Sequence, residues 1–430
     1  MTRLILVGGG HAHLHVVERI ATSRRQGDGG WDGVDVVLVS AYPAHHYSGM
    51  LPGYLQGRYR EEELRFDLVA LARVAGIRFV QGWVRRVELL EGMPGSGSPG
   101  RAVAPVGRIH TDEEVLDFHL ASLDVGSVAG GASVPGVREY AVALRPTSRA
   151  VELTERLERL RSGSPPAPGS GGEPEPGPVR AVVVGAGAAG FEVAVAVAER
   201  LHGERRPRAR VTMVEAGPSI LPEFSERVRR RGLRELARWG VQVRTDTRVT
   251  RVDGTEVQVE GWEGAAVLPS DLTVWVAGAA PPPLLASSDL PLAGSGFFSV
   301  NGALRAVNGA PVWGAGDCIE LAGFPWMPRA GVYAVRQAPV LADNLEGAVA
   351  AVRDGSGSSP PRTYTPQASF LSLLNTGGGR ALLRWKGMVA LGRWPWWLKD
   401  WIDRRFMLRY HELMKAGSDH GGAPAGSGMG

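Results

Sequence analysis

A pattern of an apolar strand, a glycine-rich turn and a helix occurs twice in the sequence, about 175 residues apart. The first copy reads LILVGGGHAHLHVVERIA from Leu4, and the second reads RAVVVGAGAAGFEVAVAVAERL from Arg180. Each copy is followed by a second apolar run, DVVLVS at 35–40 and RVTMVE at 210–215. A strand, a helix and a second strand in this order form a βαβ unit, which builds parallel sheets. We therefore expect an α/β protein with two Rossmann-like dinucleotide-binding domains.

The second turn contains a complete G-x-G-x-x-G, formed by Gly185, Gly187 and Gly190, with Ala188 at the start of the helix. The first glycine permits the tight turn, the second lets a pyrophosphate approach the backbone, and the third lets the helix pack on the strand. The N–H groups of the helix start then face the phosphates. Glu215 ends the next strand, where a carboxylate binds ribose hydroxyls and repels a 2′-phosphate, so NADH is favoured over NADPH. The alternative is a glycine turn of purely structural use.

The first turn, GGGHAHLH from Gly8, departs from this pattern. Gly10 occupies the second glycine position, but His13 stands where the third glycine is expected. Alternate histidines share a face in a strand, whereas helical residues at i and i+2 point about 200° apart, so we expect no metal site. We expect His11 near a bound pyrophosphate. Ser40 ends the next strand, where an acid is typical, and its hydroxyl can still bind a ribose.

Composition excludes several classes of protein. The 430 residues, 44% of them hydrophobic, are enough for two or three domains with cores. The 48 Lys and Arg residues and 44 Asp and Glu residues are spread along the chain, so no nucleic-acid partner is expected. A single cysteine, Cys318, excludes an intrachain disulfide and a cysteine-based zinc site. We expect a cytoplasmic protein, because the chain begins with a strand and no apolar run approaches a membrane span of roughly 20 residues.

The segment 382–415 holds five of the twelve tryptophans. Pro395 suits the first position of a helix. Five apolar side chains then share one face at helical spacing: Trp394, Trp397, Leu398, Trp401 and Ile402. Tryptophan combined with lysine and arginine is typical of a helix that lies in a bilayer interface. We expect contact with the inner face of the plasma membrane or with a second subunit of a homodimer, and the alternative is docking on the protein's own sheet.

Three further motifs resemble a known family. The paired βαβ units resemble the two-dinucleotide-domain flavoproteins of the pyridine nucleotide–disulfide oxidoreductase superfamily. GGGHAH at 8–13, YSGMLPG at 47–53 and KDWIDRRFM at 399–407 resemble motifs of one branch of it. Within it the chain is most similar to type II NADH dehydrogenases, and to the branch found fused ahead of selenide, water dikinase. The resemblance covers roughly 1–410. It implies an FAD domain with an inserted NADH domain and a quinone acceptor.

The resemblance also implies domain bounds and cofactor contacts. The segments are 1–145 and 297–350 for FAD, 146–296 for NADH and a C-terminal contact segment at 362–415. Composition rich in Pro, Gly and Ser adds a linker at 161–179 and a disordered tail at 416–430. The residues expected at FAD are Gly8, Gly9, Gly10, His11, Ala12, Ser40, Tyr47, Ser48, Leu51, Pro52, Gly316, Asp317 and Ala334. The residues expected at NADH are Gly185, Gly187, Ala188, Gly190, Glu215 and Gly278.

Three residues are expected to act on the reacting groups. Glu192 matches a family glutamate near the nicotinamide, and the alternative is an acid that stabilises a helix start. The helix within 327–345 is expected to direct its N-terminal end at the flavin pyrimidine ring, where Arg336 and Gln337 would lie beside a quinone. Val332 replaces the first glutamine of the usual A-Q-x-A-x-Q motif, so this helix could instead only pack under the flavin.

The sequence therefore predicts an FAD-dependent enzyme that oxidises NADH and reduces a quinone. Hydride transfer between two cofactors needs no acid–base residue on the donor side, because the protein sets distance and electrostatics. One cysteine excludes the mechanisms of disulfide reductases and of sulfide:quinone reductases. Two other hypotheses remain: the same fold with a selenium or sulfur acceptor, and a flavin-binding redox sensor without turnover.

Overall fold

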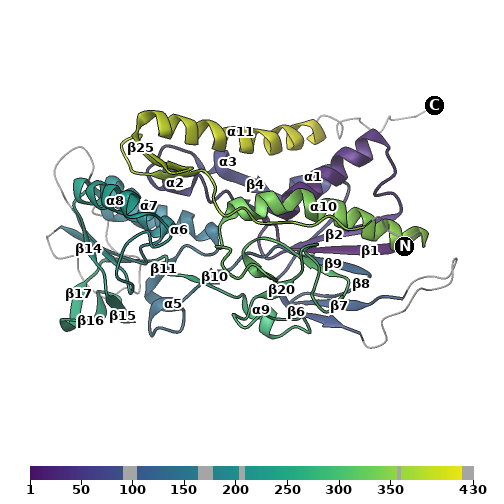
Figure 1. Ribbon diagram of the computed structural model, residues 1–430, viewed down its shortest axis with the longest axis horizontal. Coiled ribbons are helices and arrows are strands. Elements are labelled where there is room, and N and C mark those ends of the chain that lie inside the picture. Colours follow the sequence, from purple (N-terminus) through teal and green to yellow (C-terminus); the bar gives the residue numbers. More distant parts are fainter. Residues whose placement is uncertain (91–103, 163–177, 203–208, 356–359, 419–430) are drawn as a thin grey trace, which may run out of the picture.

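The computed structural model describes residues 1–90, 104–162, 178–202, 209–355 and 360–418. The predicted linker at 161–179 and tail at 416–430 lie largely outside these residues. The chain forms two parallel sheets, side by side, and a C-terminal helix that crosses above both (Figure 1). The predicted α/β class with two Rossmann-like domains is confirmed.

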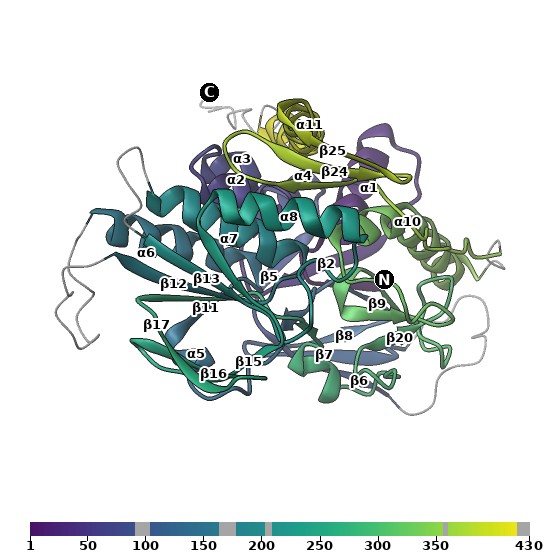
Figure 2. The same ribbon diagram turned by 60° about the vertical axis from the view of Figure 1, so that its left-hand side comes forward.

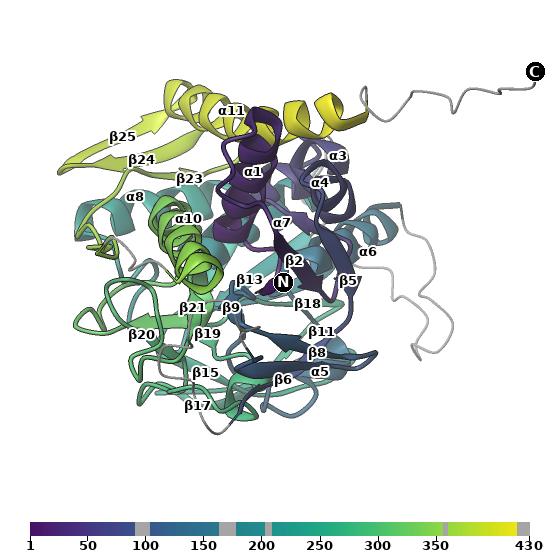
Figure 3. The ribbon, with the colours of Figure 1, turned by 90° about the vertical axis from the view of Figure 1, so that its right-hand side faces the viewer.

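The first βαβ unit belongs to a parallel sheet on which two helices pack. Its elements are β1 (Thr2–Val7), α1 (His11–Gln26), β2 (Val34–Ser40), β5 (Arg78–Gln81), β9 (Leu120–Leu123), β21 (Val312–Gly314) and α10 (Gly331–Asp354). The strands lie in the order β21-β9-β1-β2-β5. Helices α1 and α10 pack against each other over the sheet (Figure 3). The central strands are rich in Val, Leu and Ile because a parallel sheet is covered on both faces.

The second βαβ unit lies in a separate parallel sheet with the order β11-β18-β12-β13-β14. Its elements are β11 (Ala141–Ala143), α6 (Ala150–Ser162), β12 (Val179–Val184), α7 (Ala188–His202), β13 (Ala209–Val214), α8 (Glu226–Arg238), β14 (Val241–Arg244) and β18 (Leu272–Trp275). Helices α7 and α8 lie between this sheet and the C-terminal segment (Figure 2). Strand β21 comes later in the chain than this whole sheet, so the second domain is inserted into the first.

Short strands and helices, the strands mostly in antiparallel pairs, complete each domain. They are β6 (Val84–Leu89), β7 (Gly107–Thr111), β8 (Val115–Phe118), α5 (Val137–Tyr140), β15 (Thr247–Val252), β16 (Glu256–Gly261), β17 (Gly264–Pro269), α9 (Pro283–Ala286), β20 (Phe298–Val300) and β22 (Ile319–Leu321). Two segments connect the domains and pair as an antiparallel ribbon, β10 (Val128–Ala129) with β19 (Ala279–Ala280).

The C-terminal segment touches both domains. It consists of β23 (Ser372–Asn375), β24 (Ala381–Trp385), β25 (Met388–Gly392) and α11 (Arg393–Ser418). Under it lie β3 (Ala44–His46), α2 (Leu51–Leu55), α3 (Glu61–Leu64), β4 (Arg65–Asp67) and α4 (Leu68–Val74). Helix α11 packs on α3 and α4, while β23 and β24 contact α7 and α8. In the described part of the chain, no helix combines the length and apolar character that crossing a bilayer requires.

The residue at the third glycine position differs between the two turns. At Gly190 a Cβ atom would overlap the carbonyl oxygen of Gly185, so only glycine fits. In the first turn His13 is fully buried, and its Nδ1 lies 2.7 Å from the carbonyl oxygen of Gly8 and its Nε2 lies 2.8 Å from Ser122 Oγ. A carbonyl only accepts, so Nδ1 carries the proton and Nε2 accepts from the hydroxyl. The imidazole therefore ties the turn to β9.

Replacing His13 by alanine should lower the free energy of unfolding by about 3 kcal/mol, because it leaves a cavity and two buried polar atoms without partners. Chemical denaturation followed by tryptophan fluorescence measures this. The control is His110→Ala, which removes a half-buried pair with Glu88 near the surface and should change the value by less than about 1 kcal/mol. An equal loss in the two variants would show that the His13 hydrogen bonds are not specifically stabilising.

Candidate functional site

The first glycine turn is closely packed against the end of β9. Gly8 has a φ of +96°, and a Cβ atom there would overlap the backbone of Asp124. Its N–H donates to Val39 and the N–H of Gly10 donates to the Asp124 carbonyl. A Cβ atom at Gly9 would overlap Leu68. The backbone of Asp124 therefore requires glycine at position 8, whereas a side chain at position 9 would have to displace the Leu68 side chain.

The side chain of Asp124 occupies the N-terminal end of α1. The carboxylate is 3% exposed, and its Oδ2 accepts from the N–H groups of Ala12 at 2.8 Å and His13 at 3.2 Å. Burial raises the pKa of Asp124 to about 7; the two N–H donors oppose this rise and the charge of Asp317 adds to it. Asp124 was not predicted from the sequence, in which the only signal for it is a single acid directly after the short strand β9.

The remaining groups at this turn fit a flavin dinucleotide. Within the described chain nothing accepts from the N–H groups of Gly9 and His11, which leaves them for a pyrophosphate. Ser40 is half-buried at the end of β2. Asp317, where a ribitol is expected, pairs with Arg145 at 2.9 Å beside an open hollow of about 430 Å³.

The loop at 45–55 and helix α11 form an aromatic cluster around His11. The His11 ring stacks on Phe406 with centroids 5.9 Å apart, and it meets the edge of His45 at 5.2 Å and the Tyr47 ring at 5.5 Å. Burial lowers the pKa of His11 to about 4 and that of His45 to about 3, so both rings are neutral at physiological pH. The Nε2 atoms of both are buried without a hydrogen-bond partner among the described residues. Such orphaned atoms suit a polar group bound at this loop.

The other residues expected at the site lie on α10, close to its start, or in α2. Ser48 Oγ lies 3.7 Å from the Cβ position of Gly331, at the start of this helix. Ala334 is buried, and Gln337 Oε1 accepts from the N–H of Gly316 at 2.7 Å. Leu51 and Pro52 are buried in α2. Arg336, by contrast, is exposed on α10. The two neighbours therefore differ, with Gln337 in the protein interior and Arg336 on the surface.

The second glycine turn is open. Gly185 has a φ of +101°, and no heavy atom lies within 4 Å of the Cβ position of Gly187 or of Gly278, so a ligand can approach the backbone there. Glu215 accepts from the N–H groups of Ala186 at 2.7 Å and Gly217 at 2.8 Å, which fixes its carboxylate beside the turn. The N–H of Ala188 at the helix start donates to the exposed side chain of Glu223 at 3.2 Å.

Charged groups from three distant segments meet between the domains. Lys399 and Asp403 of α11 are 8% and 4% exposed and form an ion pair at 2.9 Å. Lys399 also donates to the carbonyl of Gly49, and the Tyr47 hydroxyl donates to Asp403 at 3.1 Å. Glu192, near the start of α7, accepts from a backbone N–H of β23 at 2.7 Å. The sequence analysis did not assign Lys399 or Asp403 to the site.

This arrangement sets the protonation of its members. Burial raises the pKa of Glu192 to about 7, and the charge of Lys399 only partly offsets this rise. Burial lowers the pKa of Lys399, but the carboxylates of Asp403 and Glu192 outweigh it, so the net shift is upward. The site therefore holds a permanent cation beside a carboxyl group that titrates near neutrality.

Replacing Lys399 by methionine should lower the free energy of unfolding by about 3 kcal/mol, because Asp403 would remain as a buried unpaired charge. The double variant with Asp403→Leu should lose less than the sum of the single variants. Arg404→Met is the control, since Arg404 and Asp400 form an exposed pair with the same i, i+4 spacing, and its effect should stay below about 1 kcal/mol. Denaturant titration measures all four; strict additivity would contradict a coupled buried pair.

Known proteins share this architecture. The chain is 24% identical over 410 residues to demethylphylloquinone reductase NdbB of Synechocystis, covering 92% of this chain and 93% of the relative. It is 20% identical over 282 residues to a type II NADH:quinone oxidoreductase of Staphylococcus saprophyticus, covering 64% of each. The structure of NDH2 from Plasmodium falciparum in complex with NADH matches with a TM-score of 0.76, 13% identity and 97% coverage of both chains.

A family model for pyridine nucleotide-disulphide oxidoreductases matches residues 2–355. The match includes both glycine turns, both parallel sheets and the returning strand β21, and it confirms the resemblance predicted from the motifs. The chain therefore belongs to the pyridine nucleotide-disulphide oxidoreductase family.

Proposed function

We propose that the chain is an FAD-dependent NADH dehydrogenase that passes electrons to a quinone. The observation that carries this proposal is the meeting of Glu192 from the NADH-side helix, Tyr47 from the flavin-side loop and Lys399 from α11. A donor site, a flavin site and a third element thus converge at one place. The names of the relatives, two of them quinone reductases, support the same assignment.

The residues have distinct tasks in this proposal. FAD, when bound, supplies the two-electron chemistry. The open turn at Gly187 holds the NADH pyrophosphate, and Glu215 lies where it reaches the ribose. The turn at Gly9 and the carboxylate of Asp317 hold the flavin dinucleotide. The start of α10, near Ser48, directs its partial positive charge toward the flavin ring.

Glu192, which the resemblance places near the nicotinamide, also interacts electrostatically with Lys399, so both residues can serve the acceptor side. Reduction of a quinone to a quinol takes up two protons, and a general acid works best when its pKa lies near the working pH. Glu192, with a pKa of about 7, can hold and deliver such a proton. Lys399 stays charged and stabilises negative charge on a reduced oxygen. Cys318 is buried with its pKa raised to about 12, so the chain offers no reactive thiol for a sulfur or selenium acceptor.

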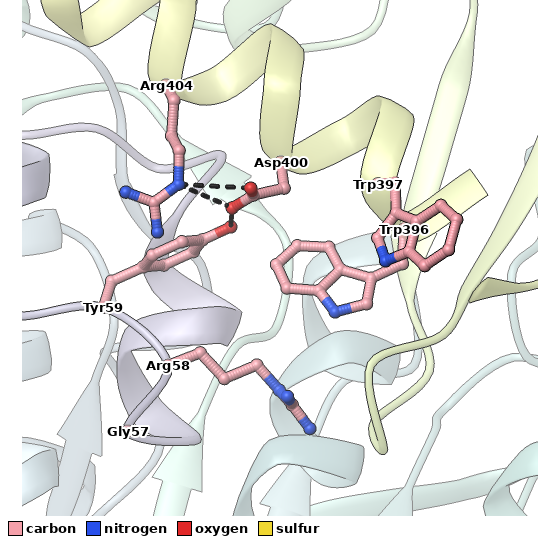
Figure 4. A pocket seen from close by; sticks show the side chains of 7 residues that line it. All are labelled: Gly57, Arg58, Tyr59, Trp396, Trp397, Asp400 and Arg404. Atoms are coloured by element: carbon pink, nitrogen blue, oxygen red, sulfur yellow. Dashed lines mark hydrogen bonds and ion pairs between the residues drawn. The ribbon is translucent and has the colours of Figure 1, made fainter. Parts of the chain in front are cut away.

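The outer face of α11 gives a lipid-soluble acceptor a route to the site. Trp394, Trp397 and Trp401 are 50%, 68% and 57% exposed, while the opposite face of the helix is buried. A groove of about 420 Å³ beside them runs between α11 and the end of α2 (Figure 4). In it the Tyr59 hydroxyl donates to Asp400, and Arg58 lies 6.0 Å from the Trp396 ring. We propose that this face lies on the inner surface of the plasma membrane.

Replacing Glu192 by glutamine should slow reoxidation of the reduced flavin by a soluble quinone roughly 10²-fold, because the proton donor is lost. The wild-type rate of flavin reoxidation should fall up to tenfold per pH unit above a pH of about 7, because Glu192 ionises there. The variant should lose this pH dependence. Anaerobic stopped-flow absorbance at the flavin band separates this step from reduction by NADH. Glu199→Gln, on the same helix and paired with Arg58, is the control and should keep the wild-type pH profile. Slower NADH reduction with normal reoxidation would instead place Glu192 at the donor.

Replacing Trp394, Trp397 and Trp401 together by serine should reduce co-sedimentation with anionic lipid vesicles by roughly tenfold or more. Point substitutions are needed, because removing α11 would also strip Met407 and Tyr410 from the core. Trp262→Ser is the control, since Trp262 is 85% exposed in the NADH domain, far from α11 in sequence. Unchanged sedimentation would contradict the membrane face. A shift from dimer to monomer in light scattering would assign the face to a second subunit.

A further inference from the structure

We propose that Asp124 controls flavin binding through its proton: the neutral carboxyl group admits the pyrophosphate at the first glycine turn, and the carboxylate opposes it. This inference rests on the proposed FAD-dependent function. It concerns a residue that lies outside the glycine pattern and that determines how tightly the cofactor is held.

The position of the carboxyl group carries the argument. It lies between the two turns expected to line the flavin, since Cβ atoms placed on Gly10 and on Gly316 would both overlap it. It also accepts hydrogen bonds from the N–H groups of Ala12 and His13, at the helix end where a dinucleotide phosphate usually binds. The second turn has no such buried acid: Gly187 faces open space, and the acid bonded at its helix start, Glu223, is exposed. Glu215, which accepts from the N–H of Ala186 at the same turn, is only half-buried. A fully buried carboxyl group is therefore built into the first phosphate site but not into the second.

The surroundings give this charge little compensation. On α1, His11 and His13 both have pKa values lowered to about 4 by burial, so neither is cationic at neutral pH. From the turn after β21, Asp317 and Cys318 face it, and the charge of Asp317 disfavours ionisation of Asp124.

Among the described residues, the nearby cations interact with Asp317 and not with Asp124. Arg145 forms its ion pair with Asp317, and Arg329 stacks on Phe297 while it interacts electrostatically with Asp317. From α10, Gln337 contributes only a neutral amide. In the described part of the chain, no hydrogen bond or ion pair joins the Asp124 carboxylate to a cation. A bound pyrophosphate would add negative charge to this site, so binding favours the protonated carboxyl.

The direction in which FAD affinity changes with pH follows from the coupling between FAD binding and protonation of Asp124. Below a pH of about 7 Asp124 is already protonated in the free protein, and FAD affinity should not vary with pH. Above that pH, binding must take up one proton. The dissociation constant should then rise up to tenfold per pH unit, and the complex should gain close to one proton per FAD.

The test measures FAD release from the full-length holoprotein. Serial dilution between pH 6 and pH 9, followed by the fluorescence of free flavin, gives the dissociation constant, and calorimetry in buffers of different ionisation enthalpy counts protons. Asp124→Asn keeps the shape of the side chain without its charge and should bind FAD with a constant that varies less than about twofold over this range. Asp124→Ser is a second uncharged variant, and it should also give a flat profile. Asp271→Asn, which removes a carboxylate paired with Arg180 in the other domain, should keep the wild-type profile.

Each outcome is decisive. A wild-type constant that does not change with pH, or uncharged variants that bind FAD more weakly than wild type at pH 9, would overturn the proposal and leave Asp124 as a helix cap. Circular dichroism at each pH shows whether a variant is folded, and a folded Asp124→Ser protein decides the question if Asp124→Asn is not. If FAD binds with this pH dependence but NADH does not reduce it, the proposed function is rejected and the role of Asp124 is kept. A protein that binds no FAD at pH 6 would reject both.

Discussion

The buried ion pair of Lys399 and Asp403 positions the C-terminal helix, and the organisation of the site depends on that helix. Two charges removed from water stabilise a structure only when their remaining hydrogen-bonding groups are satisfied. Here the Gly49 carbonyl and the Tyr47 hydroxyl satisfy them, and both belong to the flavin-side loop. The same contacts place Phe406 on the His11 ring. Two sequence motifs near the amino terminus, at 8–13 and 47–53, thus form one packed unit with a third motif at 399–407.

The two glycine turns share a plan but differ in electrostatics. The second presents an open backbone at Gly187, which suits a cofactor that binds and leaves in every cycle. The first is enclosed, with His13 tied to β9 and the Asp124 carboxyl at the helix start. An enclosed turn suits a cofactor that stays bound, since its release requires more of the surrounding structure to open. The difference in sequence between GGGHAH and GAGAAG therefore matches the difference between a resident and an exchanging dinucleotide.

Much of the fold could be predicted from the sequence, because apolar strands followed by glycine turns and helices are local patterns. The tryptophan face of α11 was also predictable from its spacing, and Trp397 is indeed exposed. Burial of Lys399 could not be predicted, because one of its two acceptors, the Gly49 carbonyl, lies 350 residues away in the chain. Asp124 was missed for a similar reason: a single acid after a short strand has no periodic signal. The residue-level assignments, among them Arg336 and Gln337, remain predictions.

Helix α11 also bears on how the protein is made. Met407, Tyr410 and Leu413 belong to the same hydrophobic core as β1 and α1, and β21 completes the first sheet only after residue 312. The amino-terminal domain is the first to leave the ribosome, yet its core lacks these side chains until almost the whole chain has been translated. The inserted domain has all five of its strands by residue 275 and can fold earlier. The first glycine turn therefore gains its complete surroundings only after residue 413 has been synthesised.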